Sequence, residues 1–141
     1  MKRESGFSLI ELLMVVVIIG VIAALAVPGL RKARQNANAG SAIQSLRTLT
    51  TAQHLYERRT QVYATLAQLV AEGQIDGHLG GGTKSGYSFN VILGAGSRSF
   101  TCTALPNEDP LTLTHFFVDE TAVIRFKEGA PADATSDPIP R

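Results

Sequence analysis

The sequence predicts an α+β protein in which one long N-terminal helix packs on a small antiparallel sheet of about four strands. Two observations lead to this fold class. An uncharged apolar run is followed by apolar residues at helical spacing as far as about Arg59, and short alternating segments then occupy the second half of the chain. A length of 141 residues allows one modest domain beside such a helix.

The apolar run has the length of a membrane span. Its nineteen residues Leu12–Leu30 carry no charge, and Glu11 is the only charge between Phe7 and Leu30. As a helix, this run is roughly 28 Å long, close to the ~30 Å hydrocarbon core of a bilayer. Pro28 removes one helical hydrogen bond and crowds the preceding turn, so we expect a kink there.

Beyond Leu30 the helical pattern becomes amphipathic. Apolar residues recur at spacings of three, four and seven while several charged residues fall between them, which predicts that this half of the helix packs on a globular head. The expected helix runs from about Phe7 to about Arg59. Its apolar stripe comprises Ala39, Ile43, Leu46, Leu49 and Tyr56.

Two weaker patterns follow the long helix. The segment Thr65–Gly73 predicts a short helix, with Thr65 as its N-cap and Gly73 at its end. The glycine-rich segment Gly77–Thr83 lacks the spacing and the Lys-Ser/Thr ending of a phosphate-binding loop, so it predicts a connecting loop.

The second half of the chain predicts the sheet. Alternating or apolar segments are bounded by turn residues, which is typical of strands in a meander. The expected strands are Tyr87–Leu93, Phe100–Ala104, Phe116–Val118 and Val123–Phe126. Cys102 falls on the apolar side of its strand, which favours a buried structural thiol. The tail from Gly129 holds three prolines and is expected to be irregular.

Charge and composition exclude several classes of function. The formal net charge of +1 is that of the first six residues, and the remainder holds eleven basic and eleven acidic side chains. This balance gives no electrostatic case for a nucleic-acid partner. Cys102 is the only cysteine, so the chain cannot form an intramolecular disulfide.

The sequence predicts no catalytic, metal or cofactor site. The three histidines fall on three different expected elements, without the short spacing that metal ligands share. Asp119 and Glu120 lie in a turn and leave a calcium site open, although calcium needs six or more oxygen ligands. The histidines are His54, His78 and His115.

Three interpretations of the N-terminal segment compete. A secretory signal would need a shorter apolar region, although Ala24–Ala26 resembles a cleavage site. A plain single-pass anchor, oriented by Lys2 and Arg3, leaves Glu11 unexplained. The third interpretation is that Glu11 has a function. A carboxylate inside an apolar helix costs several kcal/mol unless it finds a partner, so its presence indicates a function.

The residues Gly6-Phe7-Ser8-Leu9-Ile10-Glu11, followed by Leu12-Leu13, resemble the processing site of type IV prepilins and type II secretion pseudopilins. The resemblance implies cleavage between Gly6 and Phe7 by a prepilin peptidase, followed by N-methylation of Phe7. It implies that Glu11 pairs with the new amine of a neighbouring subunit during assembly. A proline at the place of Pro28 is similar to that of pilin helices.

The second half also resembles the family, less specifically. The segments Gly86–Phe89 and Phe117–Phe126, with Phe100, are similar to the strand-and-turn ending of many pilin-like proteins from environmental bacteria. One departure is the single Cys102, because pilins of pathogens close a C-terminal loop with a disulfide. The adhesive and antigenic loops of those pilins therefore do not carry over.

The resemblance implies a subunit of a homo-oligomeric helical filament, with a membrane assembly platform and its cytoplasmic ATPase as further partners. The chain would sit in the inner membrane with its N-terminus cytoplasmic and its head periplasmic, and then on the cell surface. The expected parts are a leader (1–6), an assembly helix (7–30), its amphipathic half (31–59), a β head (60–128) and a tail (129–141).

Three functional hypotheses remain open. We expect a subunit of a type IV pilus, because the head is neutral and shows no evident calcium ligand set. The alternative within the family is a pseudopilin of a type II secretion system. From another class comes a membrane-anchored enzyme or binding module in which Glu11 is incidental; it predicts a catalytic cluster that the head does not display.

Overall fold

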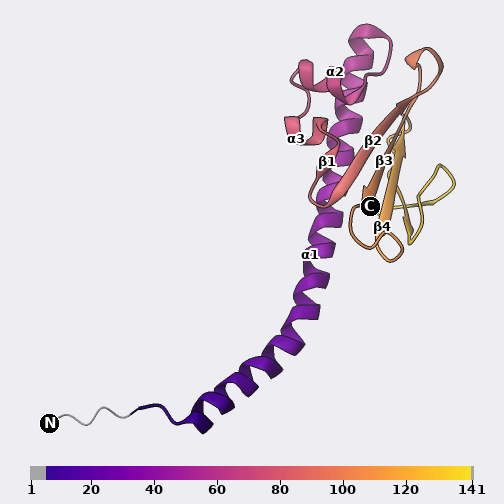
Figure 1. Ribbon diagram of the computed structural model, residues 1–141. Helices are drawn as coiled ribbons and strands as arrows, with labels where there is room; N and C mark the ends of the chain where they lie inside the picture. Colours follow the sequence, from indigo (N-terminus) through magenta and orange to yellow (C-terminus); the bar gives the residue numbers. More distant parts are fainter. Residues whose placement is uncertain (1–5, 141) are drawn as a thin grey trace. The chain divides into compact units, whose positions relative to one another are not determined.

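The computed structural model describes residues 6–140. The leader expected over Met1–Gly6 lies outside the described residues except for Gly6. The chain divides into two compact units, residues 1–36 and 37–141, and the helix α1 (Leu9–Thr60) contributes residues to both (Figure 1). This confirms the long helix expected from about Phe7 to about Arg59.

The remaining elements belong to the second unit. The helices are α2 (Leu66–Ala71), α3 (Gly77–Gly80) and the short 3₁₀ helix η1 (Ala95–Ser97). The strands are β1 (Thr83–Lys84), β2 (Tyr87–Leu93), β3 (Phe100–Pro106), β4 (Thr114–Asp119), β5 (Arg125–Glu128) and β6 (Asp137–Pro138).

The strands form one antiparallel meander in the order β1 to β6. The fold class is confirmed, but the sheet has six strands in this order where about four were expected. The two additional strands are the outermost ones, and each is only two residues long. Such short edge strands have no room for an alternating apolar pattern, which is why the sequence pattern did not reveal them.

The edge strand β1 arises from a tight hairpin. Lys84 pairs with Tyr87, and the two residues between them both have positive φ, 49° at Ser85 and 74° at Gly86. Two successive positive φ values are the pattern of a type I′ turn, whose twist matches that of paired strands. The Ser-Gly dipeptide therefore creates the hairpin, although its first strand has no apolar signature.

The prediction of a connecting loop over Gly77–Thr83 is wrong, because this segment contains α3 and the first residue of β1. Asp76 caps α3, and its Oδ1 accepts a hydrogen bond of 2.8 Å from the amide of Leu79. Leu79 is buried in the core and anchors the helix. An N-cap and one buried leucine thus order a segment whose glycine content suggested a flexible loop.

Two predictions at the C-terminal end need correction. The strand expected at Val123–Phe126 is β5, which begins two residues later because Ala122 adopts a φ of 61° and prolongs the turn. The tail contains β6, since Arg125 pairs with Pro138 and the amide of Ile139 donates to the Ile124 carbonyl over 3.0 Å. Proline is tolerated here because β6 is an edge strand.

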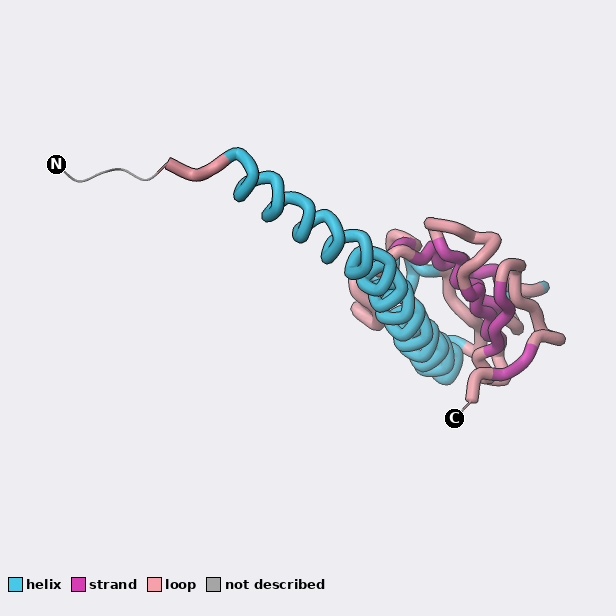
Figure 2. The backbone as a smooth tube through the Cα atoms, turned by 90° about the horizontal axis from the view of Figure 1, so that it is seen from below, coloured by secondary structure: helices cyan, strands magenta, loops and turns pink. Residues whose placement is uncertain are grey.

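The expected short helix and apolar stripe are confirmed. Thr65 caps α2 and forms a reciprocal capping box with Gln68. On α1, Leu46 and Leu49 are fully buried against the sheet, which lies along one side of the helix (Figure 2). The same core contains Phe100, Cys102 and Val118, each at most 1% exposed. The other stripe residues, Ala39, Ile43 and Tyr56, pack at its margin.

One buried polar side chain joins α1 to the segment that follows it. Gln53 is fully buried, and its side-chain amide bonds both backbone groups of Ala64: Nε2 donates to the carbonyl over 2.6 Å and Oε1 accepts from the amide over 2.8 Å. Ala64 is also fully buried, so no water can replace these bonds. Gln53 therefore fixes the chain reversal after α1.

Burial determines the chemistry of the single cysteine. Cys102 lies on β3 and is fully buried, which confirms its expected place on the apolar side of the strand. Desolvation raises the pKa of this thiol from 9.0 to about 12. The thiolate is the reactive form, so the folded chain holds this sulfur in an inert state.

The Gln53→Leu substitution is expected to destabilise the second unit by about 2–4 kcal/mol, since it leaves a buried N–H and a buried C=O without partners. Thermal unfolding of the full chain in detergent micelles should show a Tm lower by about 10 °C or more. Gln44→Leu is the matched control, because Gln44 is exposed on the same helix. Equal Tm values for the two variants would contradict the role of Gln53.

Cys102 is expected to resist iodoacetamide at pH 8 in the folded chain and to react readily in denaturant, because only unfolding exposes it and restores its ordinary pKa. The raised pKa favours folding below pH 9, and this contribution disappears as the pH rises towards about 12. Mass spectrometry after timed labelling measures both rates. Rapid alkylation of the native chain would refute the buried position.

Candidate functional site

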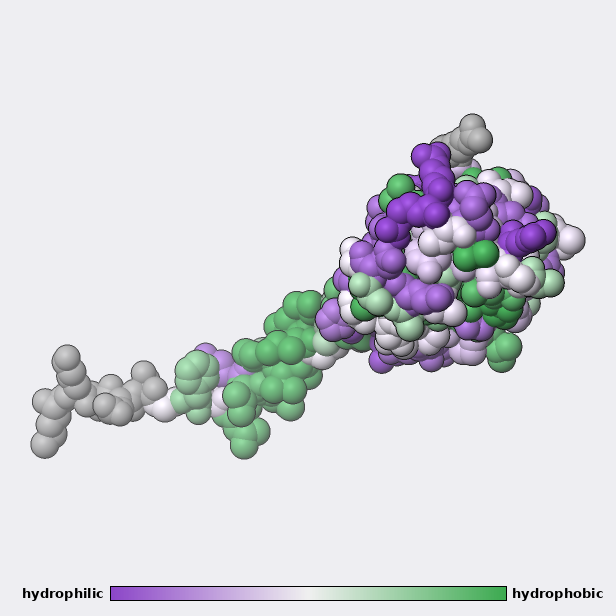
Figure 3. Space-filling view, turned by 90° about the horizontal axis from the view of Figure 1, so that it is seen from above, coloured by the Kyte–Doolittle hydropathy of each residue, from purple (hydrophilic) through white to green (hydrophobic). Residues whose placement is uncertain are grey.

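The first unit presents apolar side chains on all sides of α1. The large hydrophobic residues between Phe7 and Leu30 are 45–84% exposed, and no residue of the apolar window is buried within the structure. Figure 3 shows this segment as almost continuously hydrophobic on the face in view. A helix that is apolar all round belongs in a membrane or inside a larger core.

By length and composition, α1 can cross a membrane, and it is the one such helix within residues 6–140. A span near the N-terminus is also what a signal sequence would show, so length alone does not assign its role. The distinguishing feature is the carboxylate of Glu11, which lies in the first turn of the helix.

The predicted processing residues lie immediately before this turn. Gly6, Phe7 and Ser8 have no regular secondary structure, and the helix begins at Leu9. Phe7 is 82% exposed. A Cβ built on Gly6 would meet no atom of residues 7–140 within 4 Å, and Gly6 has no positive φ. Among the residues that the structure describes, neither packing nor backbone conformation therefore requires a glycine at this position.

Glu11 has a local partner that sequence reasoning missed. The amide of Ser8 lies 3.4 Å from Glu11 Oε2, and the amides of Glu11 and Leu12 donate to the Ser8 carbonyl over 3.1 and 3.2 Å. This is one half of a capping box, in which a Glu at the third helical position closes on the N-cap amide. The signal Ser8-x-x-Glu11 was present in the sequence.

The arrangement gives Glu11 two possible tasks. As a cap, it satisfies one of the free amides at the start of the helix, and the carboxylate also complements the positive end of the helix dipole. As an anion on an apolar surface, it can pair with a cation supplied by another molecule. A 3.4 Å contact is long for a hydrogen bond, so the cap leaves the carboxylate available.

Pro28 lies inside α1, and the helix is assigned without interruption from Leu9 to Thr60. Helical assignment tolerates a bend, so the expected kink at Pro28 stays a prediction.

The structure does not bring the histidines together. His54 lies on α1 beside Tyr63 and Phe100, with ring centroids 6.0 and 6.3 Å away, while His78 is on α3 and His115 on β4. Within residues 6–140, no group of three or more His, Cys, Asp or Glu side chains is placed to hold a metal ion.

In the turn after β4, the carboxylate of Asp119 has a local structural role. Asp119 Oδ1 accepts hydrogen bonds of 3.0 Å from the amide and 2.5 Å from the hydroxyl of Thr121. Asp commonly stabilises turns in this way. Asp119 thus has a structural role in the turn, and Glu120 beside it is exposed.

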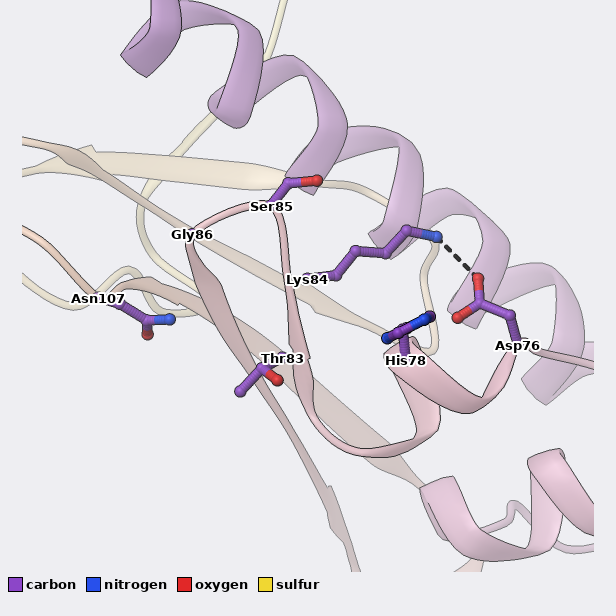
Figure 4. Close-up of a pocket in the computed structure, with 7 residues that line it drawn as sticks. All are labelled: Asp76, His78, Thr83, Lys84, Ser85, Gly86 and Asn107. Carbon is purple, nitrogen blue, oxygen red and sulfur yellow. Dashed lines mark hydrogen bonds and ion pairs between the residues drawn. The ribbon is translucent and has the colours of Figure 1, made fainter. Parts of the chain in front are cut away.

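A shallow polar hollow of about 380 Å³ lies beside α3 and the β1–β2 hairpin (Figure 4). Its charged groups are paired with each other, since Lys84 Nζ lies 2.7 Å from Asp76 Oδ2. The hydrogen bonds from Lys84 and from the Leu79 amide lower the pKa of Asp76. The pair neutralises the hollow and braces the N-cap of α3, so this is a structural feature.

The chain matches known proteins. Residues 1–27 match the family model described as the prokaryotic N-terminal methylation motif. The chain is 34% identical over 67 residues to the type II secretion system core protein G of Aeromonas hydrophila, covering 48% of this chain and 47% of that protein. The corresponding protein of Vibrio cholerae is 34% identical over 68 residues, with 48% and 47% covered.

A relative from another system is the type IV major pilin protein PilA of Myxococcus xanthus, 38% identical over 65 residues, 46% of this chain and 30% of that protein. The chain thus spans half or less of the length of the curated relatives it matches. The motif, these relatives and the long helix on an antiparallel sheet together support the type IV pilin and type II secretion pseudopilin family for this chain.

Proposed function

We propose that this chain is a structural subunit of a type IV pilus, cleaved by a prepilin peptidase after Gly6, N-methylated at Phe7 and polymerised through its N-terminal helix. The observation that carries the proposal is the combination of an apolar surface all round the helix with one carboxylate in its first turn. The methylation motif over residues 1–27 supports the processing step.

The exposed surface supplies the driving force for both anchoring and assembly. Removing a large aliphatic side chain from water gives about 1.5–3 kcal/mol, and more than a dozen such side chains are exposed between Phe7 and Leu30. Before assembly the bilayer covers them, which makes the precursor an inner-membrane protein. In a filament the same surfaces cover one another, so the helix that anchors the subunit also holds the polymer together.

Apolar surfaces give no axial register, because smooth apolar helices slide past one another at little cost. Cleavage before Phe7 creates a cationic amine, and Glu11 of a neighbouring subunit is an anion at nearly the same depth. Each charge is costly alone in an apolar surrounding and tolerable when paired. This pairing sets the stagger between neighbouring subunits.

Gly6 fits the processing step. Among residues 6–140 neither packing nor φ requires a glycine there, and a glycine lets an extended backbone enter a peptidase cleft without a side chain in the way. We assign residues 1–6 to the removed leader and residues 7–30 to membrane anchoring and assembly. The amphipathic half of the helix (31–59), the β head (60–128) and the tail (129–141) then lie outside the membrane and form the filament surface, with no catalytic role.

A second candidate is a pseudopilin of a type II secretion system, whose filament stays in the envelope. The matches to core protein G in several bacteria favour it. The matched motif concerns processing and assembly, which both systems share. The similarity therefore supports a prepilin but does not distinguish a pilus subunit from a secretion pseudopilin. In both cases, the inner-membrane platform and its ATPase would be the partners that extract the subunit.

The N-terminus of the chain in filaments sheared from living cells is expected to be methylated Phe7. Mass spectrometry of that fraction measures cleavage, methylation and surface assembly together. A chain that begins at methylated Phe7 but stays with the envelope would replace the pilus with the pseudopilin. A chain that begins at Met1, or at Val27 after a signal-type cut, would refute the proposal.

Two substitutions separate the tasks of Glu11. Glu11→Ala removes both the cap and the charge, whereas Glu11→Gln keeps a capping acceptor and removes only the charge. If the pairing with the Phe7 amine sets the register, both variants are inserted and processed, but neither polymerises. The amount of chain in the sheared fraction should fall by at least about 90%. A tenfold loss corresponds to about 1.4 kcal/mol of assembly free energy.

Normal assembly of Glu11→Gln, with failure of Glu11→Ala, would assign Glu11 to helix capping instead. Normal assembly of both variants would favour the anchored module in which Glu11 is incidental. Immunoblots of membrane and sheared fractions provide the readout, and Gln44→Leu serves as a control for the effect of substitution in the helix.

A further inference from the structure

The second unit has an apolar groove beside α1. It has a volume of about 470 Å³ and lies between the helix, the turn after β4 and the C-terminal tail. Its lining is apolar except for one side chain, the exposed cation Arg47. The apolar lining residues are Ala122, Val123, Ile124, Pro138, Ile139 and Pro140.

Arg47 has no carboxylate within ion-pair distance among residues 6–140, where the ion pairs are Arg59–Glu72 and Lys84–Asp76. Arg47 also lines a second hollow of about 240 Å³, which extends along α1 to Leu55, a residue that is 46% exposed. Within the part of the chain that the structure describes, the groove therefore offers an apolar floor with one positive charge at its edge, and no other residue covers it.

A complementary feature projects from the loop between β3 and β4. Leu111 is 83% exposed, more than any other large hydrophobic residue outside the N-terminal segment. Glu108 and Asp109, three and two residues before it, are also exposed. An exposed leucine next to two carboxylates matches, in polarity and charge, an apolar groove next to an arginine.

The Leu111 loop is held in shape by hydrogen bonds. The amides of Thr112 and Leu113 donate to the Asp109 carbonyl over 3.0 and 3.1 Å, and Gly129 donates to Leu113 over 3.0 Å. In β4, the strand that follows the loop, Nε2 of the buried His115 donates to the Pro110 carbonyl over 2.6 Å. Because the loop is already ordered, docking Leu111 requires little further loss of conformational freedom.

We propose that Leu111 of one subunit docks in the Arg47 groove of a second copy of this chain, with Glu108 or Asp109 facing Arg47. This contact rests on the proposed filament function and adds a head-to-head interface to it. The two surfaces are different parts of one chain, so the contact is heterologous. Repeated with the same rotation and rise, such a contact builds an open helical polymer instead of a closed dimer.

Cysteine cross-linking tests the contact in whole cells that assemble the filament. Leu111→Cys and Val123→Cys are introduced in a Cys102→Ser background, and a mild oxidant is applied before lysis. The doubly substituted chain should give a ladder of cross-linked multimers. Cells that produce the two single variants together should give only dimers, and either single variant alone should give monomers. Ile92→Cys with Val123→Cys is the matched control, since Ile92 is 57% exposed elsewhere on the head.

Charge reversal tests the recognition. Arg47→Glu should lower the cross-linked fraction by about fivefold, because it places like charges opposite each other, and adding Glu108→Arg should restore it. A Glu11→Ala background serves as a second control, since cross-linking should disappear when no filament forms.

The outcomes separate this contact from the proposed function. Filaments with methylated Phe7 but no 111–123 ladder overturn the contact and leave the filament function intact. Dimers from Leu111→Cys alone indicate a symmetric contact and overturn the heterologous one. Equal ladders from the Ile92 control indicate random collision and also overturn it. A ladder that persists without filaments contradicts the filament as its origin.

Discussion

The structure depends on one helix that presents apolar surface in two different ways. As far as Leu30, α1 is apolar on every side and finds no partner among residues 6–140. From Ala39 onwards it has one apolar stripe, and the sheet covers it. Because a single helix carries both surfaces, the same element that organises the core of the head also holds the membrane segment and, in our proposal, the filament.

The head has a small core, which is built around that stripe. Its core consists of one face of α1, one face of the meander and a few anchors such as Leu69 and Leu79 from the short helices. Small domains bury a low fraction of their surface, so individual polar contacts matter in them. Gln53 is such a contact, because it satisfies both backbone groups of Ala64 where water cannot reach.

Glu11 shows how one side chain can serve structure and assembly together. Its carboxylate lies near the Ser8 amide and so helps to start the helix, yet it remains on an apolar surface where a charge needs a stronger partner. A free amine at position 7 would be such a partner, supplied by the neighbouring subunit. The head contact that we infer between Leu111 and the Arg47 groove combines the same two elements, an apolar surface and one opposite charge.

The sequence by itself determined the long helix, its apolar and amphipathic halves, the capped helix at Thr65 and the two long strands, and it predicts the processing site that we propose at Gly6 and Phe7. These depend on local chemistry and on periodicity that a few neighbouring residues display. Tertiary structure alone decided the two-residue edge strands, the ordering of the glycine-rich segment through Leu79, and the start of β5 after the positive φ of Ala122. It also decided that Arg47 and the C-terminal tail line one groove and that Leu111 is exposed. Residues so distant in sequence become neighbours only when the sheet packs on the helix.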